Sequence, residues 1–118
     1  MARRKERRRR EPVPTYDYTD PEGNVLTLRQ GVSSGTIRKI GRPPRGSGPT
    51  VEDAWHRRTE MLFEYLVVGW EIAGLPLDDQ KMLVGRYRMA DAETQRWVRR
   101  TISQHLETYI PELADPDR

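Results

Sequence analysis

The sequence contains no cysteine among its 118 residues and only two histidines, His56 and His105. The lack of cysteine excludes disulfides, thiolate nucleophiles and cysteine-ligated zinc. The HExxH, P-loop and GxGxxG patterns are missing as well. A zinc hydrolase and a nucleotide-binding enzyme would therefore each lack their essential residues. We expect a non-enzymatic protein with no catalytic residue, no metal site and no cofactor.

Long apolar runs are missing too. No stretch approaches the roughly 18 apolar residues of a membrane span. The basic N-terminus is not followed by the apolar segment of an export signal. We therefore expect a cytoplasmic protein with no membrane partner. Its length suits one small domain, whose limited core favours stabilisation by a partner or by further copies of the chain.

Positive charge is concentrated at the N-terminus. Residues 1–10 hold seven Lys and Arg and one Glu, for a charge of +6, and the net charge of +3 leaves −3 for residues 11–118. We expect residues 1–14 to form a disordered basic arm. Such an arm either binds phosphates of DNA or RNA without reading their sequence, or is only a solvated terminus. The candidate nucleic-acid-binding residues are Arg3, Arg4, Lys5, Arg7, Arg8, Arg9 and Arg10.

Residues 15–40 are expected to form a β-hairpin and a short following segment. Residues 16–19 and 25–28 alternate in side-chain character, and the sequence between them, Asp-Pro-Glu-Gly-Asn, is typical of a turn. Asp20 can bond back to the turn amides, and Gly23 or Asn24 can adopt a positive φ. A two-stranded hairpin is marginal in water, so this one must dock on the helices, on another copy or on a partner.

The rest of the chain is expected to be helical. Residues 41–49, rich in proline and glycine, predict a linker, residues 50–111 a helical domain, and residues 112–118 a tail. Caps and apolar spacing predict three helices, at Thr50–Ala73, from Asp78 or Asp79 to about Met89, and from Asp91 to Pro111. The sequence thus predicts a mainly α fold with a small N-terminal β-hairpin (α+β) and a three-helix C-terminal unit.

The first of these helices is apolar on more than one face, in the run MLFEYLVVGW at residues 61–70. A lone three-helix unit covers only one side of such a helix. The surplus is either buried within the chain or left as a surface for a partner helix or a second subunit. On the second interpretation, the candidate partner-binding residues are Phe63, Leu66, Val67 and Trp70, joined by Tyr16 and Tyr18 of the hairpin.

The segment YDYTDPEGNVLTLRQGVSSGTIRKI, at residues 16–40, resembles the N-terminal part of tail assembly chaperones of long-tailed actinobacterial phages and prophages. The matching positions are Tyr16, Tyr18, Thr19, Asp20, Gly23, Thr27, Leu28, Gly35, Ile37, Arg38 and Lys39. The resemblance implies a non-enzymatic factor that forms homo-oligomers, coats the long helical tape measure protein and recruits tail tube proteins. The competing hypothesis is a small nucleic-acid-associated protein that binds phosphate through its basic arm.

Overall fold

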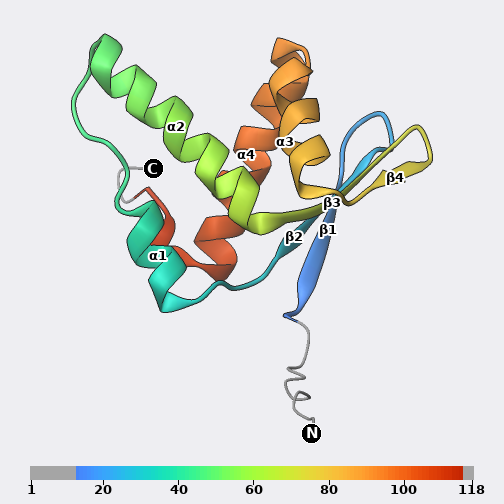
Figure 1. Ribbon diagram of the computed structural model, residues 1–118, viewed down its shortest axis with the longest axis horizontal. Helices are drawn as coiled ribbons and strands as arrows, with labels where there is room; N and C mark the ends of the chain where they lie inside the picture. Colours follow the sequence, from blue (N-terminus) through green and yellow to red (C-terminus); the bar gives the residue numbers. More distant parts are fainter. Residues whose placement is uncertain (1–12, 116–118) are drawn as a thin grey trace, which may run out of the picture.

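The computed structural model describes residues 13–115 and shows an α+β fold (Figure 1). One antiparallel sheet holds four strands in the order β1-β2-β3-β4. The strands are β1 (Thr15–Thr19), β2 (Val25–Arg29), β3 (Val67–Ile72) and β4 (Leu75–Leu77). The helices are α1 (Ser34–Ile40), α2 (Pro49–Leu66), α3 (Gln80–Met89) and α4 (Ala92–Tyr109), followed by a 3-10 turn, η2 (Pro111–Leu113). The expected mainly α fold, with a three-helix C-terminal unit beside a small hairpin, is therefore wrong.

The error lies in the segment that was expected to be one helix from Thr50 to Ala73. The helix ends at Leu66, and the chain continues directly into β3. Val67 and Val68 are β-branched and Gly69 is a poor helix former, so this tripeptide favours an extended backbone over a further helical turn. The apolar run that suggested a broad helix face is thus the end of a helix followed by a buried strand.

Gly74, just after the expected end of that helix, lies in a hairpin turn between β3 and β4. Ala73 and Gly74 both have positive φ, 52° and 80°, as the two central residues of a type I′ turn require. Pro76 follows in β4, an edge strand, where a missing backbone N–H is tolerated. Residues 50–111 are consequently not a helical domain, because they supply half of the sheet.

The N-terminal hairpin is confirmed. Asp20 accepts hydrogen bonds at Oδ1 from the backbone N–H groups of Glu22 and Asn24, each at 2.9 Å, and Gly23 has a φ of 88°. The hairpin docks on the same chain, since β2 pairs with β3 and places Leu26 opposite Trp70. The Asn24 side chain also accepts a hydrogen bond from the N–H of Ala73 at 3.0 Å, which ties the two hairpin turns together.

The two later helices begin where the sequence predicts. Asp79 accepts a hydrogen bond from the N–H of Met82 at 3.1 Å, and Asp91 accepts one from that of Thr94 at 2.7 Å. Both are side-chain N-caps. Gly85 lies within α3, and a Cβ at this position would meet nothing within 4 Å, so close packing is not its role.

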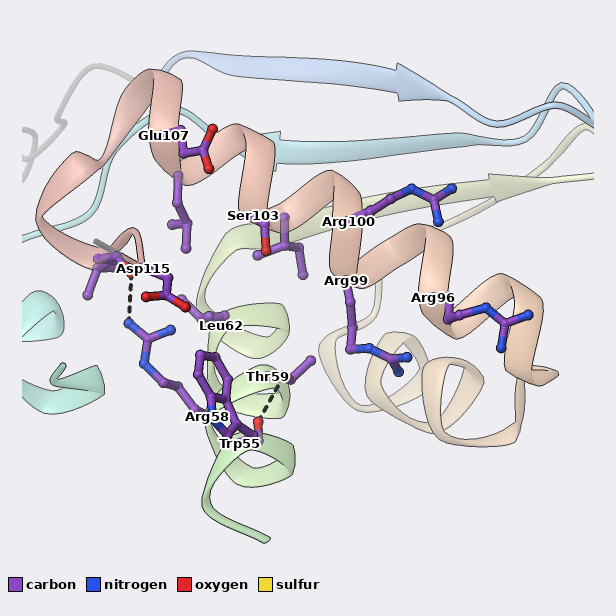
Figure 2. A pocket seen from close by; sticks show the side chains of 13 residues that line it. Trp55, Arg58, Thr59, Leu62, Arg96, Arg99, Arg100, Ser103, Glu107 and Asp115 are labelled. Atoms are coloured by element: carbon purple, nitrogen blue, oxygen red, sulfur yellow. Dashed lines mark hydrogen bonds between the residues drawn. The ribbon is translucent and has the colours of Figure 1, made fainter. Parts of the chain in front are cut away.

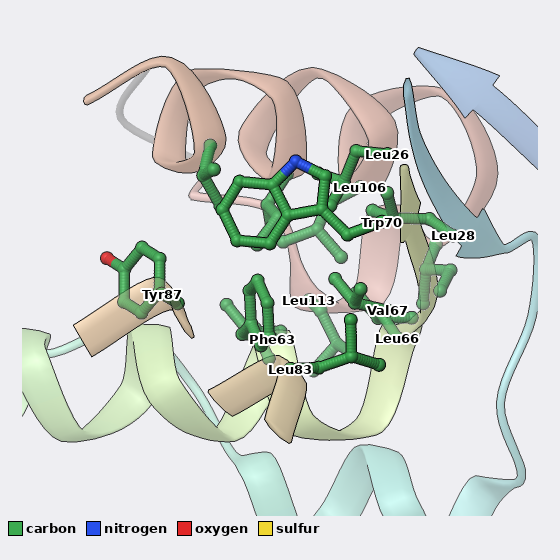
Figure 3. Packing of buried hydrophobic residues seen from close by; sticks show 14 of the residues in the cluster. Leu26, Leu28, Phe63, Leu66, Val67, Trp70, Leu83, Tyr87, Leu106 and Leu113 are labelled. Atoms are coloured by element: carbon green, nitrogen blue, oxygen red, sulfur yellow. The ribbon is translucent and has the colours of Figure 1, made fainter. Parts of the chain in front are cut away.

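The core fills the space between one face of the sheet and the helices (Figure 3). Tyr18 pairs with Leu26 and Tyr16 with Leu28, so all four side chains point to that face. The buried apolar residues of the core come from every strand and helix except β1 and β4. They include Leu26, Leu28, Phe63, Leu66, Trp70, Leu83, Val98, Ile102 and Leu106. The opposite face of the sheet carries Asp17, Thr27 and Glu71 and is more open to solvent.

The expected linker and tail lie against each other. Residues 41–48 contain no helix or strand, but residues 42–45 and residues of the C-terminal turn line one hollow of about 240 Å³. The expected tail begins with part of η2, in which Leu113 is buried. Of the expected basic arm, only Val13 and Pro14 fall within the described residues, and Pro14 accepts a hydrogen bond from the N–H of Gln30 at 2.8 Å.

Candidate functional site

The four apolar residues that were expected to bind a partner lie in the core. Phe63, Leu66, Val67 and Trp70 are each at most 2% exposed (Figure 3). The ring of Phe63 stacks on Tyr87 of α3 with centroids 5.0 Å apart and meets Trp70 edge-on at 6.0 Å. Of the two interpretations of the apolar surplus, burial within the chain is therefore the correct one for these four residues, because α3, α4 and the sheet cover them.

The two hairpin tyrosines lie in different surroundings. Tyr16 is 47% exposed and packs loosely against Tyr18 and Tyr109, with ring centroids 5.0 and 6.0 Å away. Tyr18 is half-buried, and burial raises the pKa of its hydroxyl to about 12. Tyr16 thus keeps a surface that another molecule can reach, and its role in partner binding stays a prediction. The candidate arm residues Arg3, Arg4, Lys5, Arg7, Arg8, Arg9 and Arg10 lie outside the described residues.

His105 holds the hairpin against α4. The ring is fully buried, and its Nε2 and Nδ1 lie 2.6 Å from the Arg29 carbonyl oxygen and the Tyr18 hydroxyl oxygen. Because a carbonyl only accepts, Nε2 carries the proton, and in the neutral ring Nδ1 accepts from the Tyr18 hydroxyl. Burial lowers the pKa of His105, and the bond to the Arg29 carbonyl opposes this shift. His105 is thus a buried structural group.

We expect the protein to lose stability in mild acid because of His105. An unfolded chain takes up a proton near the ordinary histidine pKa of 6.5, whereas the folded chain resists it. The free energy of unfolding should therefore be highest above this pH and fall as the pH drops towards the folded pKa. Urea denaturation at a series of pH values from about 7.5 to about 5 measures this slope.

Two variants isolate the histidine responsible for that slope. His105→Phe should be less stable at neutral pH, since it loses both hydrogen bonds, but should lack the decline over this range. His56→Gln, at an exposed position on α2, should keep the decline. An undiminished decline in His105→Phe would assign it to other groups.

A groove lies between α2 and α4, and we call it the α2–α4 groove (Figure 2). It has a volume of about 340 Å³. Helix α2 forms one wall of the groove and α4 forms the other. The turn η2 and Asp115 close one end. The lining residues are Trp55, Arg58, Thr59 and Leu62 from α2, Arg96, Arg99, Arg100, Ile102, Ser103, Leu106 and Glu107 from α4, and Leu113 and Asp115.

The floor of the groove is apolar and continuous with the core. Leu62, Ile102 and Leu106 are buried, and the half-buried indole of Trp55 lies above them on α2. The hydroxyl of Thr59 donates to the carbonyl of Trp55 at 2.9 Å, so it is engaged within its own helix. An apolar floor with one accessible indole is suited to apolar side chains of a partner.

Arg58 fixes the closed end of the groove. Arg58 is 6% exposed, and its Nη2 donates to the carbonyls of Leu113 at 2.8 Å and Gly41 at 3.1 Å. Burial lowers the pKa of Arg58, and the nearby Asp115 carboxylate opposes this shift. Arg58 thus clamps residues before α2 and residues after α4 onto the helix between them.

The open end of the groove is basic. Arg96 and Arg99 are three residues apart on α4, and Figure 2 shows Arg99 pointing towards the side on which Trp55 and Thr59 lie, while Arg100 points along the other side of α4. Within residues 13–115, Arg99 forms no hydrogen bond or ion pair through its side chain. Sequence analysis missed these arginines because charged residues on the polar side of an amphipathic helix are the usual solvated face.

Other parts of the surface carry less defined features. A broader hollow of about 590 Å³ lies between the β3–β4 hairpin and α3, where Met82 and Met89 are 57% and 89% exposed. Charges of both signs, from Glu22, Arg86 and Asp91, line its edge. On α2, Glu60 forms a bidentate ion pair with Arg88 of α3, with a shortest distance of 2.7 Å. In the described part of the chain, no group of three His, Asp or Glu residues is arranged to hold a metal ion.

Comparison of the chain with models of protein families, with curated proteins and with solved structures gives no match. The resemblance of residues 16–40 to tail assembly chaperones is therefore neither supported nor opposed by these searches. Between residues 13 and 115, every helix is too short or too polar to cross a lipid bilayer.

Proposed function

We propose that this protein is a non-enzymatic tail assembly chaperone of a long-tailed phage or prophage, which holds a segment of the tape measure protein in the α2–α4 groove. It acts in the cytoplasm of the bacterial host as a homo-oligomer and recruits tail tube proteins. The observation that carries this proposal is the groove itself, an apolar floor between two helices with an accessible tryptophan on one wall.

The geometry favours a helical ligand. Along α2 the lining residues recur at positions 55, 58, 59 and 62, and along α4 at positions 96, 99, 100 and 103, so each helix presents one face to the groove. A third helix can lay one face of its own against two such faces. The volume of about 340 Å³ accommodates side chains from one face of a helix and not the whole helix.

The choice of the tape measure protein as ligand comes from the resemblance at residues 16–40. That protein is long and helical, so it offers many segments of the kind that the groove accommodates. Self-association and binding of tail tube proteins are implied by the same resemblance, and we assign no surface to either of them. Tyr16, with its exposed ring, is the remaining candidate from the hairpin.

The test is co-expression with a phage tape measure protein, followed by co-purification. Trp55→Ala is expected to weaken the complex by about 2 kcal/mol or more, roughly thirty-fold, because a central aromatic anchor is lost. The variant should stay folded, since Trp55 is only half-buried, and circular dichroism checks this.

His56→Ala is the matched control, because it changes the exposed neighbour of Trp55 on the same helix. A chain that lacks residues 1–11 should bind the helical partner as the full chain does. If no complex forms with the full chain, or if Trp55→Ala leaves the complex intact, the proposed function is wrong. Binding of DNA or RNA that disappears with residues 1–11 and falls steeply with salt would then favour the nucleic-acid hypothesis.

A further inference from the structure

We propose that the α2–α4 groove selects an acidic amphipathic helix, with one partner carboxylate paired to Arg99, a second near Arg96, and apolar residues on the floor beside Trp55. This inference rests on the proposed function and adds the chemical class of the ligand. It does not follow from the family resemblance, which covers residues 16–40 and none of the groove.

Arg99 carries the argument. Its side chain is half-buried beside an apolar floor, and it has no carboxylate or carbonyl partner within residues 13–115. A guanidinium beside an apolar floor, with no counter-charge from the described residues, keeps its hydrogen-bond donors available to a ligand. A ligand carboxylate would accept a bidentate, charge-assisted pair of hydrogen bonds from Arg99, and the bound ligand would exclude water from the site. The free protein therefore leaves unpaired a group that an acidic ligand would pair.

The surrounding charges have the same sign at the open end. Arg96 lies one helical turn before Arg99 and is exposed. Hydrogen bonds from Thr94 lower the pKa of the Asp91 carboxyl, and the nearby charge of Arg96 adds to this shift. Deeper in the groove, the buried Arg58 adds a further positive charge. Carboxylates three or four residues apart on a partner helix match the spacing of Arg96 and Arg99.

The groove is less suited to a nucleic acid. Glu107 and Asp115 line its closed end, so a phosphate backbone that ran along the groove would meet carboxylates there. The floor formed by Leu62, Ile102 and Leu106 offers apolar contacts, which a helix with leucines on one face can use fully. Charge at one end and apolar surface along the middle together describe an amphipathic helix.

The experiment uses the full chain and labelled synthetic helical peptides of about five turns, the length of α2. The first peptide has leucines on one face and glutamates beside them, the second has glutamine at every glutamate, and the third has lysine there. Fluorescence anisotropy measures binding. The acidic peptide should bind, the glutamine peptide should bind about tenfold more weakly or worse, and the lysine peptide should not bind measurably.

Charge variants of the protein test the location. Arg99→Glu should weaken the acidic peptide about tenfold or more and should allow the lysine peptide to bind. Arg38→Glu makes the same change of charge at an exposed position on α1 and should leave both affinities unaltered. Thermal melting compares the folding of the two variants, and both side chains can be exchanged without emptying the core.

Four outcomes would overturn the inference. The first is that the acidic and glutamine peptides bind equally well, and the second is that Arg99→Glu has no effect. The third is that duplex DNA displaces the acidic peptide and needs Arg99 to do so. The fourth is that the protein forms a dimer through Arg99 and that this dimer excludes the peptide. The first two leave the proposed function standing if Trp55→Ala still disrupts the complex with the tape measure protein. Charge-dependent peptide binding without any such complex would remove the proposed function and keep the inference.

Discussion

Replacing Phe63 by alanine is expected to lower the free energy of unfolding by about 3–5 kcal/mol, a large part of the stability of a domain of this size. The Phe63 ring is fully buried at the point where α2, α3 and β3 meet. It stacks on Tyr87 and meets Trp70 edge-on, so its removal leaves a cavity that two large aromatic rings border. Urea denaturation, with the slope of the transition compared between variants, measures the loss.

Phe63→Leu is the matched control, since it keeps most of the volume and should cost less than about 1.5 kcal/mol. A loss below about 1 kcal/mol for Phe63→Ala would mean that the ring is not enclosed. The same packing changes how neighbouring substitutions must be interpreted. Leu66→Asp and Trp70→Asp place a charge in the core, so they should unfold the protein, and the loss of partner binding in either variant would say nothing about a binding surface.

Local signals predicted those parts of the fold that depend on a few neighbouring residues. The first turn forms as expected because Asp20 bonds to amides two and four residues later. The starts of α3 and α4 follow from Asp79 and Asp91, each of which bonds to an amide three residues later. In each case, the stabilising contact is encoded within a short stretch of chain, where sequence shows both partners.

The strand β3 was missed because its pattern also fits a helix. Leu62, Leu66 and Trp70 are four residues apart and read as one helical stripe, although only the first two lie in α2. The decisive contact is the pairing of Leu26 with Trp70, two residues 44 positions apart in the printed sequence. Once β2 offers an edge for pairing, the β-branched pair at positions 67 and 68 is better placed in a strand. No local pattern contains that information.

The candidate site was missed for a related reason. Trp55 fits the apolar stripe of its own helix, and the arginines of α4 fit the polar face of theirs. The groove arises from the way in which α2 and α4 are set against each other and closed by η2. Sequence could have drawn attention to Arg96 and Arg99 only through their spacing of three residues, which is common on solvated helices.

Replacing Arg58 by alanine is the second change with a large expected effect, a loss of about 3 kcal/mol in the free energy of unfolding. The guanidinium donates to the carbonyls of Gly41 and Leu113, which lie before α2 and after α4. Without the donor, the buried Leu113 carbonyl loses a charge-assisted partner. Arg57→Ala removes an exposed arginine from the preceding position and should cost less than about 0.5 kcal/mol.

Hydrogen exchange shows whether Arg58→Ala loosens the η2 turn in particular or destabilises the whole protein. The amides of Leu113 and Ala114 bond within η2, to the carbonyls of Ile110 and Pro111, so their protection reports on the turn that Arg58 holds. Arg58→Ala should speed exchange at these two amides more than at amides in the middle of α4. Because Leu113 closes the groove, the variant should also bind the acidic peptide more weakly than wild type although Trp55 and Arg99 are unchanged. If Arg58→Ala had the same stability and the same exchange rates as Arg57→Ala, the hydrogen bonds of Arg58 would contribute nothing. The closed end of the groove would then be held by the packing of Leu113 alone.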